Sequence, residues 1–486
     1  MKLKSLSLSV MVGLAFGLPV PAAMASGYHF GSQSVSAQGT SHANSAEAAD
    51  ASVLFYNPAG MSLLDGTQFA GGLTFVIPDS SYTDHGSTNY LGQSTGSGNG
   101  GTYAPDLVVA PSFYLTHQLN DRVHIGLGIF VPYGAKLDYG SNWAGRYSLE
   151  KIDMKTININ PSISFKLDDR QSLGFGVSAQ YMDAELVQGA DAKTGVALLA
   201  AKRLGLSPTS PLVQGALASY GISGDGTGTV NGDDWGFGWN VGYMFKLDDR
   251  TRFGLAYRSK VNHTLKGTWD WDFSNVTGAV PNAILTGLPV PGSTSVATLA
   301  GMEHPDSNAT VKVVTPESAS ANFFHELNDK IDVMGDLTWT RHSRLNEIRI
   351  QQSTVNGVSQ GDLVINQQWK NTYKLSLGMN YHYSDNLLLR TGVAYDQSPV
   401  KNDNLRHPAL PDSDRYWFSV GANYKLNKQS SVDLAYSYVY FKDGNMNYTD
   451  SCNPAGGASC TGNGETTKGE YKTNLQIVGV QYNYHF

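Results

Sequence analysis

The sequence predicts an all-β fold: a transmembrane barrel of fourteen antiparallel strands with an N-terminal hatch (plug) and short helices in its extracellular loops. Three observations predict it: a secretory signal at the N-terminus, short turns that recur between segments of alternating polarity, and a last strand that ends in an aromatic residue. The chain is mildly polar on average although it holds 53 Gly and 26 Tyr residues. A secreted soluble sandwich or propeller shares this composition, but in a barrel only every second residue meets lipid, so the average looks soluble.

The chain begins with a secretory signal peptide, which we assign to residues 1–25. Lys2 and Lys4 precede an apolar stretch and then small residues that end at Ala25. A basic start, a short apolar core and a small-residue cleavage site define such a signal. Beyond it, no apolar run is long enough to cross a bilayer as a helix. The net charge of -7 gives no support to nucleic acid as a partner, because a phosphate reader needs a basic face.

Residues 26–65 are too many for a simple tail and too few for a domain. They contain small-residue-rich turns followed by Phe55 and then by the block Asn57, Pro58, Ala59 and Gly60. The lumen of a fourteen-stranded barrel is wider than its own side chains can fill. We therefore expect this segment to fold into the lumen as a hatch.

The barrel is assigned to residues 66–486, which are divided by a recurring turn of the type Leu-Asn-Asp-Arg. The turn begins at Leu119, Leu167, Leu247 and, in looser form, at Leu327, Tyr383 and Leu426. Asn and Asp tolerate the left-handed conformation that tight hairpins use. Short turns face the periplasm, so six of them join seven outer hairpins and give fourteen strands, an even number as single-chain bacterial barrels require.

The strands are expected at about 67–77, 107–118, 123–134, 151–165, 172–187, 235–246, 251–269, 310–324, 331–352, 364–383, 387–395, 415–425, 431–447 and 470–486. The last of them alternates clearly. One face carries Phe486, Tyr484 and Tyr482, and the other carries Asn483 and Gln481. In a barrel the aromatic face points to the membrane and the polar face to the lumen. The terminal aromatic resembles the signature that the barrel assembly machinery reads.

The long outer loops contain two further features. Segments 192–204, which includes Leu198, and 211–220 are rich in Ala and Leu, so short helices are expected there. Their apolar faces either pack against another loop or capture an apolar ligand. Cys452 and Cys460 lie in an exported Gly/Pro-rich loop, which favours a disulfide. Two thiols alone do not make a zinc site, and no metal or cofactor is expected.

The Asn57–Gly60 block resembles the hatch of the FadL family of outer-membrane transporters. The resemblance extends over the mature chain through blocks that start at Val131, Trp143, Asn158, Asp233, Phe253, Leu389, Tyr395 and Leu410. Members of this family take up long-chain fatty acids or toluene-like hydrocarbons. The resemblance therefore implies an outer-membrane transporter in a Gram-negative bacterium, surrounded by lipid and lipopolysaccharide and acting as a monomer.

The resemblance also implies a route for the ligand. Ligand is captured among outer loops, where Trp143 and Leu198 are candidates, and then reaches a tighter site against the hatch near Phe55. A break in the third strand opens a lateral exit, and Pro132 and Gly134 are suited to such a break because Pro cannot donate to the ladder and Gly weakens it. An alternative is that Pro132 merely ends the strand.

A fatty acid site needs an apolar lining and one cationic anchor. Arg349 is the candidate anchor, although Glu347 on the same face offers it a structural ion pair. Gln188 stands where fatty acid members have another basic residue, which keeps neutral aromatic hydrocarbons open as cargo. A lipase would need a nucleophile motif of the G-x-S-x-G kind, which we do not find. A general diffusion porin would lack a plug, and an adhesin would act through its loops.

Overall fold

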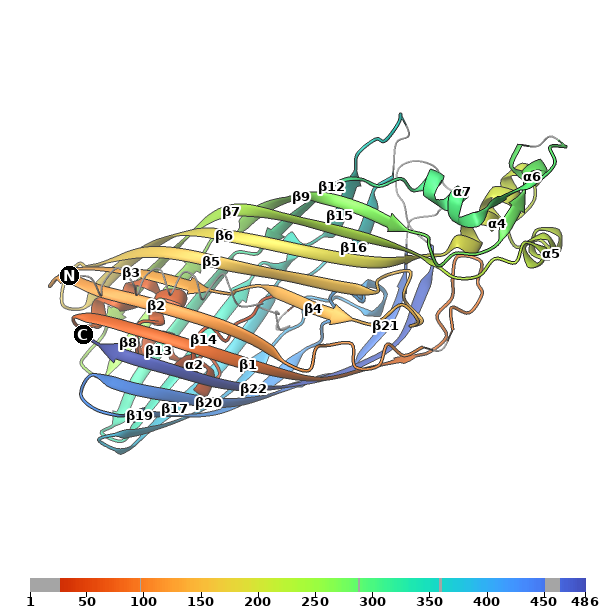
Figure 1. Ribbon diagram of the computed structural model, residues 1–486. Coiled ribbons are helices and arrows are strands. Elements are labelled where there is room, and N and C mark those ends of the chain that lie inside the picture. The colour runs from red at the N-terminus through yellow and green to blue at the C-terminus, as the bar shows by residue number, and fades with distance from the viewer. Residues whose placement is uncertain (1–26, 97, 287–288, 358–360, 451–463) are drawn as a thin grey trace.

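The computed structural model describes residues 27–486 except 97, 287–288, 358–360 and 451–463. The signal peptide and the cysteine pair Cys452 and Cys460 lie outside the described residues. A closed, antiparallel, fourteen-stranded barrel confirms the predicted fold class. It closes where the first strand pairs with the last, from Gln68 opposite His485 to Asp84 opposite Gly469. Figure 1 shows the strands running along the barrel from the turns at one end to the loop helices at the other.

Several wall strands are interrupted, so the fourteen strands carry more than fourteen labels. In order, the wall consists of β1 (Thr67–Asp84), β2 (Val108–Asn120), β3 (Val123–Phe130) with β4 (Gly134–Asp138), β5 (Lys151–Lys166), β6 (Gln171–Ala190), β7 (Gly226–Lys246), β8 (Thr251–Arg258) with β9 (Val261–Asp272), β12 (Ser307–Thr315) with β13 (Ser318–Asn328), β14 (Ile331–Thr340) with β15 (Glu347–Gln352), β16 (Leu363–Asn366) with β17 (Thr372–Ser384), β18 (Leu387–Asp396), β19 (Arg415–Lys425), β20 (Ser430–Phe441) with β21 (Gly444–Thr449), and β22 (Thr466–His485).

The remaining elements lie inside the barrel or in its outer loops. The hatch contains α2 (Val35–Gly39), η1 (Asn44–Ala46), α3 (Val53–Tyr56) and η2 (Pro58–Leu63). The outer loops contain α4 (Ala192–Leu204), α5 (Pro211–Ser219), β10 (Ala279–Pro281), α6 (Asn282–Thr286), β11 (Ser293–Ser295), α7 (Val296–Glu303), η3 (His342–Arg344) and η4 (Asp403–Leu405). None of the described helices is both long and apolar enough to cross a bilayer.

The wall alternates as the last strand predicts. On β22, Val478, Val480 and Tyr482 are exposed, whereas Gln481 and Asn483 are buried toward the lumen. The outward apolar positions of other strands are also exposed, for example Leu337, Leu375, Leu377, Phe418, Val420 and Leu434. These side chains form the lipid-facing band that a transmembrane barrel requires.

The six short turns lie where the repeat predicts, but their expected conformation is wrong. No described residue of these turns other than glycine has a positive φ. Instead, in five of the six turns the side chain of the first Asn or Asp accepts backbone N–H groups across the turn. Asn120 accepts from Arg122 and Val123, and Asn427 accepts from Gln429 and Ser430. These turns therefore select Asn and Asp for the side-chain oxygen and not for left-handed backbone.

The strand boundaries depart from the prediction chiefly at the outer end. β7 begins at Gly226 instead of Trp235, because Gly226 to Asp234 pair with β6 in a sheet that continues beyond the lipid band. The segment 251–269, expected to be continuous, breaks between β8 and β9, and the segment 310–324 breaks at Pro316. Proline lacks the N–H that a ladder needs, which accounts for the second break.

Candidate functional site

Residues 27–64 fold inside the barrel and are almost entirely buried (Figure 1). Within this hatch, the Asn57 side chain accepts a hydrogen bond from the Ala59 N–H at 3.1 Å and so starts η2, with Pro58 in the first turn. Its amide also donates to the carbonyls of Tyr243 on β7 (3.1 Å) and Leu255 on β8 (3.3 Å). One side chain therefore caps the hatch helix and fixes it to two wall strands.

Three glycines on the wall make room for this contact. A Cβ on Gly174 would lie 2.3 Å from the Ala59 nitrogen, and one on Gly242 would lie 2.0 Å from Asn57 Oδ1. A Cβ on Gly254 would lie 2.9 Å from Asn57 Nδ2. β6, β7 and β8 thus lack side chains where the hatch motif approaches their backbone.

A buried ion pair holds the other side of the hatch. Arg390 on β18 binds both carboxylate oxygens of Glu47 at 2.9 and 3.0 Å. Their side chains are only 4% and 11% exposed, respectively, so solvent screens the pair weakly. Asn380 donates to the same carboxylate at 2.8 Å, and Arg252 donates to the Glu47 carbonyl at 3.2 Å. Glu47 is therefore the main polar contact between the hatch and this part of the wall.

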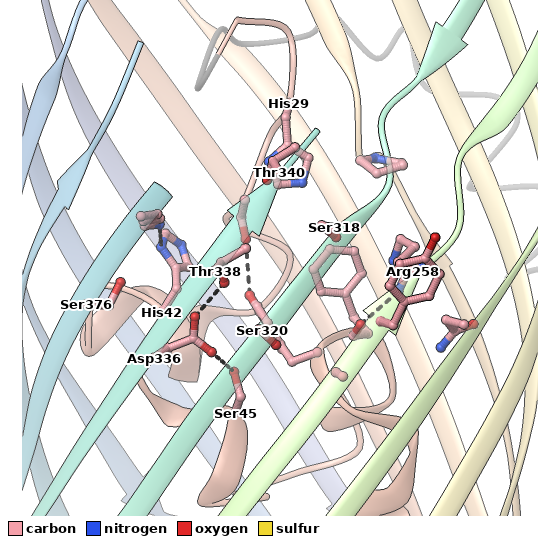
Figure 2. A pocket seen from close by; sticks show the side chains of 18 of the residues that line it. His29, His42, Ser45, Arg258, Ser318, Ser320, Asp336, Thr338, Thr340 and Ser376 are labelled. Atoms are coloured by element: carbon pink, nitrogen blue, oxygen red, sulfur yellow. Dashed lines mark hydrogen bonds between the residues drawn. The ribbon is translucent and has the colours of Figure 1, made fainter. Parts of the chain in front are cut away.

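A cavity lies between the hatch and the wall (Figure 2). The hatch contributes His29, Gly31, His42, Ser45, Phe55, Tyr56 and Pro58. The wall contributes Pro132, Tyr133, Asn240, Val241, Ala256, Tyr257, Arg258, Ser318, Ser320, Asp336, Thr338, Thr340, Thr372, Lys374, Ser376, Asp396 and Trp417. The lining combines aromatic rings with hydroxyl groups, two cations and two carboxylates, so it can surround an apolar chain and also hold a polar head.

The Lys374 ammonium reaches the hatch from β17. Its Nζ donates to Nδ1 of His42 at 2.6 Å and lies 4.7 Å from the centre of the Trp417 ring. Burial and the charge of Lys374 hold the pKa of His42 well below its ordinary value, so the ring is neutral. Since Nδ1 accepts, Nε2 carries the proton and donates to Ser32 Oγ at 3.0 Å. Within the described part of the chain, no carboxylate oxygen lies within 4.0 Å of this ammonium.

Arg258, on β8, is the second cation of the cavity. It donates to the Phe55 carbonyl at 2.7 Å, and its guanidinium lies 4.8 Å from the Phe55 ring and 5.5 Å from the Phe130 ring. Among the described residues it has no ion pair either. Arg258 therefore lies between the hatch and the end of β3, with guanidinium donors still open to a ligand.

The carboxylates of the cavity bind other groups. Asp336 accepts from Ser45 of the hatch at 3.1 Å and from Thr338 at 2.5 Å, as Figure 2 shows. Asp396 lies 3.5 Å from the guanidinium of Arg415. Among the described residues, neither Lys374 nor Arg258 thus has a carboxylate at ion-pair distance, although Asp396 and Asp336 act on Lys374 from further away. A ligand with an anionic head would give both cations a direct partner.

The strand ladder of the wall is interrupted beside β4. β2 pairs with β3 from Asn120 up to Phe113, which lies opposite Ile129, and β4 pairs with β5. Among the described strands, no ladder joins β2 to β4, so β2 residues 108–112 pair only with β1. Between β3 and β4 lie Val131, Pro132 and Tyr133, and β4 begins at Gly134. The interruption thus includes Pro132, whereas Gly134 is already the first paired residue of β4. A role for either residue in a lateral exit stays a prediction.

The other predicted site residues lie in separate places. Phe55 lines the cavity. Trp143 is 1% exposed, stacks 4.1 Å from Tyr139 and donates to the Leu149 carbonyl, inside the packed outer loops. Leu198 is half-buried on α4, whose apolar face packs against the neighbouring loop helices. Their roles in ligand capture stay predictions.

Arg349 has two carboxylate partners and does not line the cavity. Its guanidinium lies 2.7 Å from Glu347 and 2.9 Å from Asp362. The competing ion pair with Glu347 is therefore present, and a second one accompanies it. A role for Arg349 in ligand binding stays a prediction.

Lys374 and Arg258 are absent from the sequence-based candidates, although strand alternation points to them. Tyr373, Leu375 and Leu377 are exposed to lipid, which places the intervening Lys374 in the lumen. On β8, Phe253 and Leu255 are exposed to lipid, so alternation places Arg258 in the lumen. A basic residue at a lumen-facing position of a membrane-spanning strand was therefore the sequence signal that could have identified both residues as site candidates. Among the described residues, no group of three or more His, Cys, Asp or Glu side chains could hold a metal ion.

Residues 20–486 match the family model described as outer membrane protein transport protein (OMPP1/FadL/TodX). The chain belongs to this family. This FadL-family protein is 37% identical over 488 residues to an outer membrane protein of Neisseria meningitidis serogroup B, with 98% of each chain covered. It is 29% identical over 447 residues to the long-chain fatty acid transport protein of Escherichia coli O157:H7, with 90% of this chain and 93% of the relative covered.

A solved structure agrees in fold. The crystal structure of a Pseudomonas aeruginosa FadL homologue superimposes with a TM-score of 0.76 at 24% identity, covering 95% of this chain and 100% of the other. Membership of the family, shown by the family model and the curated relatives, makes the protein an outer-membrane transporter of hydrophobic compounds in a Gram-negative bacterium, and not an enzyme.

Proposed function

We propose that the protein carries long-chain fatty acids across the outer membrane. The observation that supports this proposal is the hatch-side cavity, in which, among the described residues, Lys374 and Arg258 have no carboxylate at ion-pair distance. A buried cation is costly without a counter-charge, and a fatty acid carboxylate supplies one. Phe55, Tyr56 and Trp417 offer apolar surface for the chain that follows the head.

The transport route is proposed in three steps. Ligand is captured among the outer loops, where Leu212 and Met302 expose apolar side chains at 65% and 68%. It then enters the cavity above the hatch, and it leaves through the wall between β2 and β4, where the ladder is missing. The hatch fills the lumen below the cavity, which favours a lateral exit over passage straight through the barrel.

Uptake of neutral aromatic hydrocarbons is the second candidate. The aromatic part of the lining favours it, since Phe55, Tyr56, Tyr133, Tyr257 and Trp417 all border the cavity. A neutral hydrocarbon would not use the two cations, so the two cargo classes predict different effects of removing them.

The partners of the mature barrel are part of this proposal. Phe486 is 73% exposed at the end of β22, where it is available to the barrel assembly machinery. The lipid-facing band would contact outer-membrane lipid and lipopolysaccharide. We propose a monomer, because one chain closes the barrel.

Fatty acid binding to purified protein tests the cargo. K374M should lower the affinity for oleate by about 10- to 100-fold, the range expected for a lost hydrogen bond to a charged group. K370M is the matched control, because Lys370 is exposed just before β17 and does not line the cavity. Toluene binding should change little in either variant.

Growth gives the complementary test. A host without its own fatty acid transporter should grow on oleate when it carries this gene. Failure on oleate together with gain of growth on an aromatic hydrocarbon would replace the fatty acid proposal with the second candidate.

A further inference from the structure

The opening between β2 and β4 is closed from inside by the first described residues of the hatch. The Phe30 N–H donates to the Pro132 carbonyl at 2.8 Å, and the Gly134 N–H donates to the Tyr28 carbonyl at 2.8 Å. His29 and Tyr133 form an antiparallel bridge between them. The hatch therefore continues the sheet for one bridge across the interruption of the strand.

Gln33 adds contacts on both sides of the opening. Its side-chain amide donates to the Val131 carbonyl at 2.6 Å, and its side-chain oxygen accepts from the Val131 N–H at 3.2 Å. On the other side, its backbone carbonyl accepts from the Tyr114 hydroxyl of β2 at 2.9 Å. The amide also donates to the Phe30 carbonyl at 2.7 Å, so one residue ties β2, the strand break and the hatch together.

The hydrogen bonds between Gln33 and Val131 are buried, so breaking them is energetically costly. Gln33 is 1% exposed, and Val131 is 3% exposed. Neither backbone group of Val131 is bonded along the β2 or β5 ladders, since pairing of β3 ends at Phe130. Separation of Gln33 from Val131 would leave buried polar groups without partners, which is unfavourable.

Phe30 supports the same closure with apolar contacts. It is 2% exposed and belongs to a cluster with Val108 and Ala110 of β2, two positions that face the opening and pair only with β1. Hydrogen bonds therefore hold the hatch to the β3–β4 side, while apolar packing and the Tyr114 bond hold it to the β2 side.

We propose that Gln33 is the positioning residue that keeps the lateral exit shut until cargo occupies the cavity. The inference rests on the proposed route through the wall. The cavity and Gln33 are connected through the hatch, because Ser32, next to Gln33, accepts a hydrogen bond from His42, the partner of Lys374. Movement of Lys374 toward a carboxylate would thus be transmitted to the residue beside Gln33.

The first test compares two buried glutamines of the hatch. Q33L removes the amide that binds Val131, whereas Q38L removes an equally buried amide that donates to the Ile477 carbonyl on β22, away from the opening. Per folded barrel, Q33L should raise initial oleate uptake and leakage of a neutral fluorescent probe on the order of 3- to 10-fold, which corresponds to one net hydrogen bond. Q38L should raise neither.

A folding defect gives a different result, because it lowers the amount of heat-resistant folded barrel and the uptake together. The affinity for oleate, measured on purified Q33L, should stay within about twofold of wild type because the cavity is intact. Uptake per folded barrel that is equal in Q33L and Q38L would overturn the role of Gln33.

The second test locks the closure. His29 and Tyr133 face each other as a pair without mutual hydrogen bonds, the arrangement in which Cα atoms are about 4.5 Å apart and a disulfide fits. H29C/Y133C, in a background with C452S and C460S, should stop uptake when oxidised and restore it when reduced, while its affinity for oleate is the same in both redox states. Uptake by the fully oxidised protein would overturn the closure. Failure of the wild-type protein to bind oleate, with hydrocarbon uptake by the double variant still controlled by oxidation, would instead overturn only the fatty acid cargo.

Discussion

Lys374 Nζ lies 2.6 Å from His42 Nδ1, so one hydrogen bond joins a membrane-spanning strand to the hatch at the floor of the cavity. An ammonium has three donors, and His42 uses only one of them. His42 therefore orients the cation while leaving it able to bind a carboxylate.

This relationship predicts the effect of removing His42. H42A should lower oleate affinity about 3- to 10-fold, because the ammonium loses the acceptor that orients it. H42N should retain most of the affinity, since Asn places an oxygen near the Nδ1 position and tolerates the left-handed backbone of His42, whose φ is 71°. Binding titrations at neutral pH check both variants, and equal affinities for H42A and wild type would exclude the orienting role.

The close contact between the hatch and the three wall glycines Gly174, Gly242 and Gly254 predicts that a single added methyl group displaces the hatch. G174A should push η2 away from β6, because the added Cβ would lie 2.3 Å from backbone atoms that cannot rotate aside. Hydrogen exchange within residues 27–64 should become faster while exchange in the wall strands is kept. G195A on α4 is the control, since its Cβ meets open space. Similar hydrogen exchange in both variants would contradict the claim that the hatch needs a glycine at position 174.

The Glu47–Arg390 pair predicts a strong coupling. R390M leaves a buried carboxylate without its counter-charge and should destabilise hatch docking by about 3–5 kcal/mol. E47Q/R390M should recover part of this loss, because the uncompensated charge is gone. Hydrogen exchange of the hatch in the single and double variants measures the coupling. Additive effects of the two substitutions would show that the pair contributes little.

His407 predicts the pH dependence of the outer loop between β18 and β19. Burial lowers the pKa of His407 to about 3, and its Nδ1 accepts from the Ala409 N–H at 3.0 Å. The unfolded loop takes up a proton below about pH 6.5, whereas the folded loop does so only near pH 3. Stability from this group is thus complete above pH 6.5 and falls as the pH drops below it, by about 1.4 kcal/mol at pH 5.5.

Proteolysis of this loop between pH 5 and 8 measures the effect. H407N keeps an acceptor near the Nδ1 position but does not titrate, so its proteolysis should change less below pH 6.5 than that of the wild type. Parallel pH profiles for the two proteins would assign the dependence to other groups.

Much of the barrel was predictable because strand alternation and turn chemistry are local properties. Residues that are close together in the sequence determine the turns at Asn120 and Asn427 and the alternation of β22. The breaks between β8 and β9 and at η3 interrupt segments whose alternation predicts continuous strands, so the local pattern does not reveal them.

The candidate site was predictable only in part, for a related reason. Phe55 and the Asn57 motif lie in one contiguous block, so they could be recognised together. Lys374 and Arg258 are far apart in the chain and meet only when the barrel closes around the hatch. Arg349 has the correct chemistry, but Asp362, from a neighbouring stretch, binds it as well.

The three glycines under Asn57 and Pro58 have a consequence for engineering. Because Gly174, Gly242 and Gly254 leave bare backbone where the hatch lies, the surfaces of the hatch and the wall are sterically complementary at these positions. A hatch transplanted from a relative should dock only if the recipient barrel also carries glycine at these three positions. Exchange of cargo preference between relatives is thus a matter of moving both parts as one unit.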